Sequence, residues 1–219
     1  MLTVKWLHKS FSDTQVLRGV DMALEPRLVY TLTGGNGSGK TTLFNIITGF
    51  LKPTSGLLAF NEQNISQLTP FKINRAGIGR TFQDLRLALQ MTALENILLA
   101  QERKMFTFAT SEQRRHAETV LERVALAHQK DTLAGELSYG QQKLLTIGCC
   151  IANNAELLLL DEPVAGIDKD NFKKITELVR KLRDSGKTIL QIEHHPDYIN
   201  ETSDRVLALE NGHLFECAC

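Results

Sequence analysis

One short segment near the N-terminus has the residue types and spacing of a phosphate-binding loop. Residues 34–41 read GGNGSGKT, which fits the pattern GxxxxGK[ST]. Glycines let backbone N–H groups converge on phosphate oxygens, the lysine adds a positive charge, and the threonine hydroxyl can reach Mg²⁺. The expected phosphate-binding residues are Gly34, Gly35, Asn36, Gly37, Ser38, Gly39, Lys40, Thr41 and Thr42. A flexible glycine-rich turn is the disfavoured alternative, because an apolar stretch typical of a strand (29–33) precedes the loop and an apolar helical stretch (43–47) follows it.

Two adjacent carboxylates form the second candidate feature. Asp161 and Glu162 follow a run of four leucines, which is typical of a buried parallel strand. Such a strand delivers both side chains to the carboxyl edge of the sheet, where ligands bind in open α/β folds. Asp161 suits coordination around Mg²⁺, and Glu162 can polarise a water molecule. The alternative is a charge pair at a helix N-terminus, since Pro163 comes next.

A third feature is the sequence LSYGQ at 137–141. Ser138 and Gln141 have the S-x-x-Q spacing of a capping box at the start of a helix expected over 142–152. A capped helix alone is the simplest explanation of this pattern.

The surrounding elements predict an α/β fold with a mixed sheet. Apolar or β-branched runs at 29–33, 157–160 and 188–192 are typical of buried parallel strands. Alternating patterns at 2–6 and 16–24 predict an antiparallel sheet near the first strand–helix unit.

The rest of the chain fits into the same domain. A polar turn over 12–15 is expected to join the first two strands, and a helical subdomain is expected at about 85–150, inserted in the α/β core. No linker or repeat divides the chain, so we expect residues 1–219 to form a single domain.

Composition excludes several classes of protein. The 25 basic residues equal the 25 acidic ones and no basic arm is present, which disfavours direct nucleic-acid binding. The first eleven residues lack the pattern of a secretion signal, and the longest near-apolar stretch is far shorter than the ~20 residues that span a bilayer. The four cysteines match neither a disulfide framework nor a zinc site, so reduced thiols and a cytoplasmic setting are expected.

In this order, the phosphate loop, LSYGQ and the leucine run ending in Asp161-Glu162 resemble the nucleotide-binding subunits of ATP-binding cassette (ABC) transporters. The signature loop of that family reads LSGGQ. The resemblance covers nearly the whole chain and implies a P-loop ABC ATPase fold, in which two subunits dimerise head to tail. Each ATP would lie between one phosphate loop and the signature loop of the other subunit, here Leu137, Ser138, Tyr139, Gly140 and Gln141.

The resemblance also implies roles for single residues. Gln83 matches the Q-loop glutamine, which contacts the metal or the attacking water. His194 matches the switch histidine, although His195 beside it is an alternative. Asp168 matches the D-loop acid at the dimer interface and also fits a helix N-cap. Phe11 resembles the aromatic residue that stacks on adenine, with a core phenylalanine as the alternative.

The implied activity is ATP hydrolysis by in-line attack of water, with Glu162 and His194 as catalytic groups and Mg²⁺ held by Thr41, Gln83 and Asp161. The sequences of several motifs are most similar to those of importers of branched-chain amino acids or related amides such as urea. Partners would be a second cassette, membrane permease subunits and an extracytoplasmic substrate-binding protein, at the cytoplasmic face of the inner membrane. The short segment after 211–212 weakens this subclass, so an exporter of lipid or polysaccharide and a soluble non-transport ABC ATPase remain alternatives.

Overall fold

A six-stranded sheet forms the centre of the computed structural model, which describes residues 1–101 and 109–217. Its strand order is β10-β9-β3-β8-β7-β6; only β10 runs antiparallel to its neighbour, and every other pair is parallel. The strands are β3 (Val29–Thr33), β6 (Ile78–Arg80), β7 (Leu157–Asp161), β8 (Thr188–Ile192), β9 (Arg205–Glu210) and β10 (His213–Cys217).

The three strands predicted as the sheet core are confirmed and lie side by side in the order β3, β8, β7. The strand predicted over 157–160 extends one residue further, so Asp161 is its last residue. Strands β9 and β10 were not predicted. β10 is mostly exposed and therefore carries little hydrophobic pattern.

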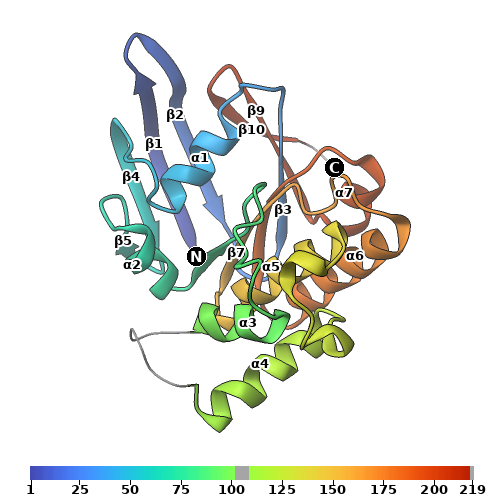
Figure 1. Cartoon of the computed structure of the whole chain (residues 1–219). Helices are drawn as coiled ribbons and strands as arrows, with labels where there is room; N and C mark the ends of the chain where they lie inside the picture. Colours follow the sequence, from blue (N-terminus) through green and yellow to red (C-terminus); the bar gives the residue numbers. More distant parts are fainter. Residues whose placement is uncertain (102–108, 218–219) are drawn as a thin grey trace.

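A second sheet is antiparallel, as predicted, with the order β2-β1-β4-β5 (Figure 1). Its strands are β1 (Leu2–Phe11), β2 (Thr14–Leu24), β4 (Ser55–Phe60) and β5 (Gln63–Asn64). The polar turn expected over 12–15 is shorter than predicted: Phe11 pairs with Thr14, and Ser12 adopts a left-handed φ of 47°. Because the connection has only two residues, the polar residues Thr14 and Gln15 belong to β2.

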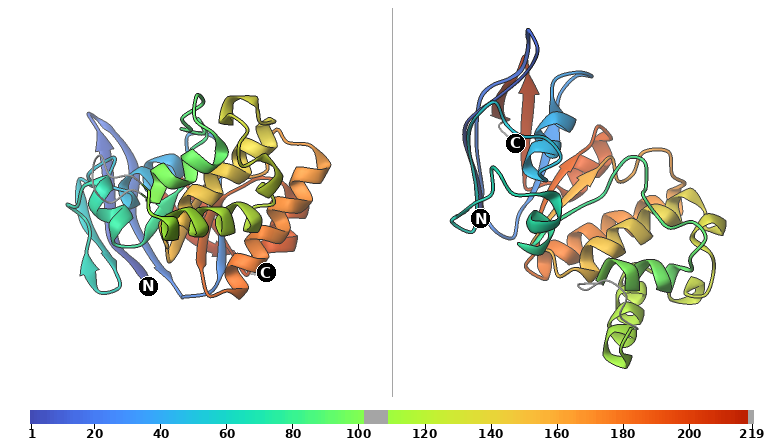
Figure 2. Two further views of the ribbon diagram at one scale, coloured as in Figure 1. Left: turned by 60° about the horizontal axis from the view of Figure 1, so that its bottom comes forward. Right: turned by 60° about the vertical axis from the view of Figure 1, so that its left-hand side comes forward.

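Seven α-helices are present in the described part of the chain. They are α1 (Lys40–Ile47), α2 (Pro70–Arg75), α3 (Ala93–Gln101), α4 (Ser111–Arg123), α5 (Tyr139–Ala152), α6 (Lys169–Asp184) and α7 (Pro196–Thr202), with short 3₁₀ turns at Ala127–Gln129 and Ala134–Glu136. Helices α3, α4 and α5 pack against one another, away from the antiparallel sheet (Figure 2). No helix in the described ranges has the length and apolar character needed to cross a membrane.

The expectation of helix from about residue 85 is wrong at its N-terminal end, because the first helix of this segment, α3, begins at Ala93. Residues 81–92 are irregular. The buried Asn96 side chain accepts a hydrogen bond from the backbone N–H of Ala88 and donates to its carbonyl, which fixes the preceding chain in a non-helical path. Part of the expected helical segment, 102–108, lies outside the described residues.

Strand β7 separates two hydrophobic cores. Leu157 and Leu159 belong to the core shared with the antiparallel sheet and α1, whereas Leu158 and Leu160 belong to the core shared with α3 to α6. All four leucines are fully buried. Because both faces of β7 are packed, the position of its carboxyl end is fixed, and this end carries Asp161 and Glu162.

Candidate nucleotide-binding and hydrolysis site

The phosphate loop connects β3 to α1 and depends on glycine at defined positions. Gly34, Gly37 and Gly39 have φ values of 145°, 77° and 106°. A Cβ atom at Gly34 would lie 2.4 Å from the carbonyl oxygen of Leu209, so β9 leaves no room for a side chain there. The loop therefore requires glycine at this position, and it leads directly into the N-terminus of α1, where backbone N–H groups can bind phosphate.

Lys40 is the first residue of α1 and is buried. Its Nζ donates to the carbonyl oxygens of Gly34, at 2.7 Å, and Gly35, at 3.0 Å. Burial lowers the pKa of Lys40, and the nearby charges of Glu162 and Asp161 act in the opposite direction. The phosphate loop and the two carboxylates after β7 are therefore close enough to interact, as a hydrolysis site requires.

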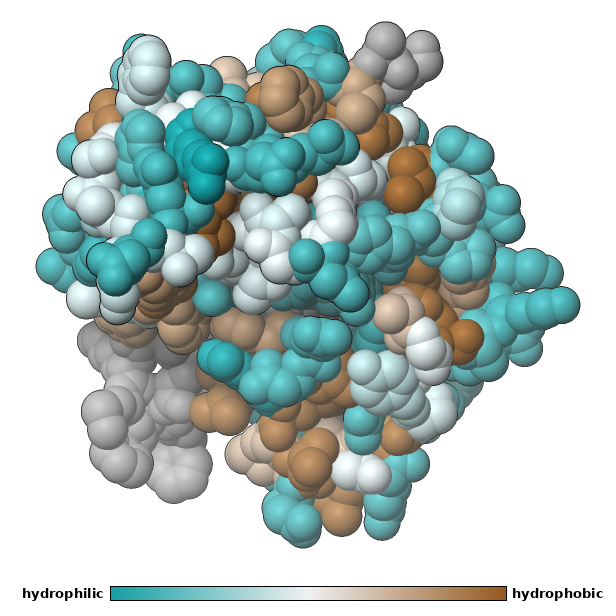
Figure 3. Space-filling model, turned by 90° about the horizontal axis from the view of Figure 1, so that it is seen from above, coloured by the Kyte–Doolittle hydropathy of each residue, from teal (hydrophilic) through white to brown (hydrophobic). Residues whose placement is uncertain are grey.

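A hollow of about 580 Å³ lies beside the loop, and the β1–β2 hairpin and the β9–β10 turn also contribute to it. Ser38 lines this hollow, and its hydroxyl oxygen is buried without a hydrogen-bond partner in the described part of the chain. A buried hydroxyl without a partner is costly, and a phosphate oxygen would satisfy it. Seen from above, hydrophilic side chains predominate in the upper part of the view, and apolar side chains gather in its lower middle part (Figure 3).

Asp161 is held by contacts that connect β7 to β6. Its carboxylate Oδ2 lies 3.2 Å from Arg80 Nη2, and both side chains are almost fully buried. Its backbone N–H donates to the hydroxyl of Thr81. Arg80 also donates to Asn45 and Thr48 of the α1 segment. Arg80 thus joins α1, β6 and β7 behind the candidate metal-binding carboxylate.

Glu162 adopts a left-handed backbone conformation, with φ of 48°. Its N–H donates to Ile192 at the end of β8, and its carbonyl accepts a hydrogen bond of 2.5 Å from Lys143 Nζ. Strained non-glycine conformations persist where the surroundings fix them, and they are frequent at functional sites. The contacts of Glu162 on both sides meet that condition.

The residues expected to hold Mg²⁺ supply suitable oxygen atoms. Thr41 lies exposed in the first turn of α1, and Gln83 lies exposed in the irregular segment after β6. Hydroxyl, amide and carboxylate oxygens are the ligands that Mg²⁺ prefers. Within the described residues, no group of three or more Asp, Glu, His or Cys side chains could hold a metal alone. The set fits an ion whose remaining ligands are phosphate oxygens and water.

The signature sequence caps and begins α5, which starts at Tyr139, three residues before the expected start at 142. Ser138 caps the helix by accepting from Gln141 N–H, and the Gln141 side chain accepts from Ser138 N–H, which confirms the capping box. A Cβ at Gly140 would lie 2.5 Å from Asn171 Nδ2, so only glycine allows α6 to approach this closely. Leu137 is buried, whereas Tyr139 is 45% exposed.

Asp168 is the N-cap of α6, which confirms that prediction. One of its carboxylate oxygens accepts from the backbone N–H groups of Asp170 and Asn171, and the other accepts from the Asn171 side chain. These hydrogen bonds lower the pKa of Asp168. Asn171 therefore lies between Asp168 and Gly140.

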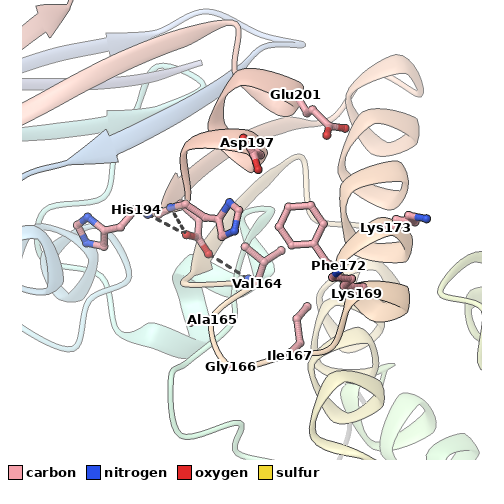
Figure 4. A pocket seen from close by; sticks show the side chains of 12 residues that line it. Val164, Ala165, Gly166, Ile167, Lys169, Phe172, Lys173, His194, Asp197 and Glu201 are labelled. Atoms are coloured by element: carbon pink, nitrogen blue, oxygen red, sulfur yellow. Dashed lines mark hydrogen bonds between the residues drawn. The ribbon is translucent and has the colours of Figure 1, made fainter.

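The two adjacent histidines differ in their surroundings. The ring of His195 packs against Phe172, with centroids 4.9 Å apart. The side chain of His194 points away from the pocket formed by residues 164–167, α6 and α7 (Figure 4). That pocket, of about 610 Å³, is lined by both histidines and by residues 164–167, but not by the phosphate loop or Asp161. His194 stays the predicted residue for the site, with His195 as the alternative.

Phe11 ends β1 and is 44% exposed, which rules out the alternative of a core phenylalanine. Lys9 Nζ lies 4.8 Å from the centre of its ring. The side chain is available for stacking, although Phe11 itself is not part of the wall of the hollow beside the phosphate loop.

Three polar residues near the site were not identified from the sequence: Arg80, Lys143 and Glu193. All three side chains are buried. Lys143 and Glu193 each carried a recognisable signal, because a charged residue occurs within an apolar helical stretch or directly after a buried strand. Charged groups are rarely buried unless they are paired.

Comparison with known proteins supports one family. The family model described as "ABC transporter" matches residues 17–165. The branched-chain amino acid transport ATP-binding proteins LivG of Escherichia coli K12 and BraF of Pseudomonas aeruginosa are each 37% identical over 97% of this chain and 89% of their own length.

Solved structures agree with this result. The ADP conformation of an ATP-binding cassette of an ABC transporter gives a TM-score of 0.88 at 34% identity, covering 98% of this chain and 89% of that one. A dimeric post-hydrolysis cassette bound to ADP and Pi gives 0.86 at 26% identity and covers both chains completely. The chain has the P-loop ABC ATPase fold, belongs to the ABC transporter family and is one of its ATP-hydrolysing cassettes.

Proposed function

We propose that this cassette drives the import of branched-chain amino acids through separate permease subunits. The observation that carries the proposal is the 37% identity to LivG and BraF over 97% of the chain. A ribose import ATP-binding protein of Bacillus subtilis is 32% identical, so cassettes of this kind serve more than one type of cargo. The cargo would be selected by the membrane subunits and by an extracytoplasmic substrate-binding protein.

Within the site, we assign the phosphates of ATP to the loop 34–41 and to Lys40, whose ammonium group already bridges two loop carbonyls. Glu162 would polarise the attacking water, and His194 would orient the γ-phosphate and this water. Catalysis of this kind depends on positioning and on stabilisation of charge. Gln83 would contact the water and transmit motion to the permease.

Thr41, Gln83 and Asp161 are the residues that would hold Mg²⁺. When bound, the ion would neutralise charge on the β- and γ-phosphates. The pairing of Asp161 Oδ2 with Arg80 leaves the carboxylate able to accept further hydrogen bonds, because its two oxygens offer about four acceptor positions. Arg80 would keep this carboxylate oriented toward the ion.

We infer that the complete site contains two copies of the cassette or one copy and a paralogue. Residues Leu137 to Gln141 of one subunit would cover the ATP bound to the phosphate loop of the other, with the positive N-terminus of α5 directed at the γ-phosphate. Asp168 would lie at this interface, and Phe11 would stack on the adenine.

Residues 1–219 would act as one cassette with the helical segment at about 85–150 directed toward the permease. The cassette would be peripheral, at the cytoplasmic face of the inner membrane, without direct contact to nucleic acid. This arrangement explains how a chain without a membrane-spanning helix in its described residues serves transport.

Affinity isolation of the tagged chain from gently solubilised membranes tests the proposal. Mass spectrometry should identify two polytopic subunits, and the purified complex in proteoliposomes should take up leucine, isoleucine or valine when ATP is present. A complex that transports only sugars, lipids or polysaccharides would contradict the cargo. Recovery with ribosomes or DNA-repair factors, without polytopic proteins, would contradict the transport role.

A further inference from the structure

We propose that Lys143 and Glu193 are positioning residues that connect the signature helix, the catalytic turn and the histidine segment. Through them, the signature sequence would move together with the catalytic groups of the same subunit. The catalytic turn is defined here as residues 162–165. The proposal rests on the roles proposed above for Ser138, Glu162 and His194.

Lys143 provides the connection from the signature helix. It lies in the second turn of α5, five residues after Ser138, and is 5% exposed. Its Nζ donates to the carbonyl oxygens of Glu162, at 2.5 Å, and Ala165, at 2.7 Å. These two carbonyls flank the catalytic turn, so a single ammonium group closes the turn and attaches it to α5.

Glu193 provides the connection from the histidine segment. It directly follows β8 and is 3% exposed. Its Oε1 accepts from the backbone N–H of Val164 at 3.0 Å, and its Oε2 accepts from the N–H groups of His194, at 2.8 Å, and His195, at 3.2 Å. The carboxylate therefore bridges the catalytic turn and the histidine segment, as the dashed lines in Figure 4 show.

Both charged groups bond to the backbone of the catalytic turn, Lys143 from α5 and Glu193 from the end of β8. Burial lowers the pKa of Lys143, and Glu193 is the strongest of the nearby charges that oppose this effect. The described residues contain no direct ion pair between Lys143 and a carboxylate, so backbone groups satisfy the ammonium donors. The buried ammonium and carboxylate hold the backbone of neighbouring segments in one arrangement.

This arrangement has a mechanical consequence for the dimer. The signature loop of a subunit faces the ATP bound to its partner, whereas Glu162 and His194 act on the ATP bound to their own subunit. A displacement of α5 is transmitted through Lys143 to the backbone of Glu162. Glu193 transmits the same displacement to the backbone of His194. Closure around one ATP would then set the catalytic groups at the other.

Glu193→Gln and Lys143→Met test the proposal in the purified full-length chain. The matched controls are Glu177→Gln and Lys174→Met, which make the same replacements at exposed positions of α6. We expect kcat for ATP hydrolysis to fall at least tenfold in both test variants, with KM for ATP changed less than twofold. The Hill coefficient for ATP should decrease toward one, and the controls should match the wild type.

The double variant distinguishes joint action of Lys143 and Glu193 from independent effects of the two residues. If the two residues act as one unit, Lys143→Met with Glu193→Gln lowers kcat about as much as the more severe single variant. Multiplied losses, unchanged kcat with a lowered Tm, or an unchanged Hill coefficient would overturn the proposal. An inactive wild-type chain would instead contradict the proposed function.

Hydrogen exchange of the wild type gives a second test that requires no variant to fold. The amides of Val164, His194 and His195 all donate to one carboxylate, so their protection should increase together when ATP and Mg²⁺ are added. Protection of the histidine segment without the catalytic turn would overturn the connection.

Discussion

Replacement of Arg80 by methionine removes the cation that pairs with Asp161 at the end of β7. The two side chains are 5% and 10% exposed and lie 3.2 Å apart. Methionine retains much of the apolar volume beside the rings of Phe44 and Phe82. Removing one partner of a buried ion pair leaves the other charge uncompensated and costs about 3–5 kcal/mol. We expect the free energy of unfolding to fall by this amount.

Urea unfolding followed by circular dichroism measures the effect. Arg180→Met is the matched control: the pair of Arg180 with Glu201 also spans 3.2 Å, but the side chains are 42% and 46% exposed. Exposed pairs contribute roughly 0.2–1 kcal/mol, so the control should lose no more than that from its charge.

A double-mutant cycle isolates the pair itself. Asp161→Asn in the Arg80→Met background removes the unpaired charge, so the loss should be smaller than the sum of the single losses by about 1.5–3 kcal/mol, the range for a hydrogen bond to a charged group. If Arg80→Met loses no more stability than Arg180→Met, or if the cycle shows additivity, the reasoning about this pair is refuted.

Three further sets of variants test other parts of the structure. Gly34→Ala forces a Cβ to within 2.4 Å of a backbone carbonyl of β9. Overpacking costs about 1–3 kcal/mol, so scanning calorimetry should show a Tm lowered by roughly 2–12 °C. The control Gly35→Ala meets no atom within 4 Å and should leave Tm nearly unchanged. Burial raises the pKa of the Cys150 thiol above its ordinary value of 9.0, so above this pH the folded state keeps a proton that the unfolded state loses. The free energy of unfolding should therefore fall as pH rises above this value. Urea unfolding should show a weaker fall for Cys150→Ala and the same fall as the wild type for the exposed Cys217→Ala. Asp168→Ala removes the cap of α6 and should lower the urea midpoint, whereas Asp168→Asn, which keeps an acceptor for the helix N–H groups, should restore most of it.

The parts predicted from the sequence are those with local signals. The phosphate loop has a fixed spacing, the leucines before Asp161 form a run that is typical of a buried strand, and Ser138 and Gln141 are three residues apart. Each signal lies within a few residues, so it could be interpreted without knowledge of the tertiary structure.

The parts that were not predicted depend on contacts between distant residues. Arg80 and Asp161 are 81 positions apart, and Val164 and Glu193 are 29 apart. A single sequence contains no pattern that pairs such residues. The late start of α3 has a more local cause, because the side chain of Asn96 bonds to the backbone of Ala88, eight positions earlier. Side-chain hydrogen bonds, which hydrophobic periodicity does not reveal, therefore determined both the missed residues and the incorrect helix boundary.

The most direct test of the central claim is the state of association of Glu162→Gln in the presence of ATP. A cassette that binds ATP between two subunits and needs Glu162 for hydrolysis should form a dimer with ATP and Mg²⁺ and remain a monomer with ADP. Light scattering coupled to size-exclusion chromatography measures both states, and phosphate release measures the expected loss of turnover. A variant that hydrolyses ATP at the wild-type rate and stays monomeric with ATP would contradict the account.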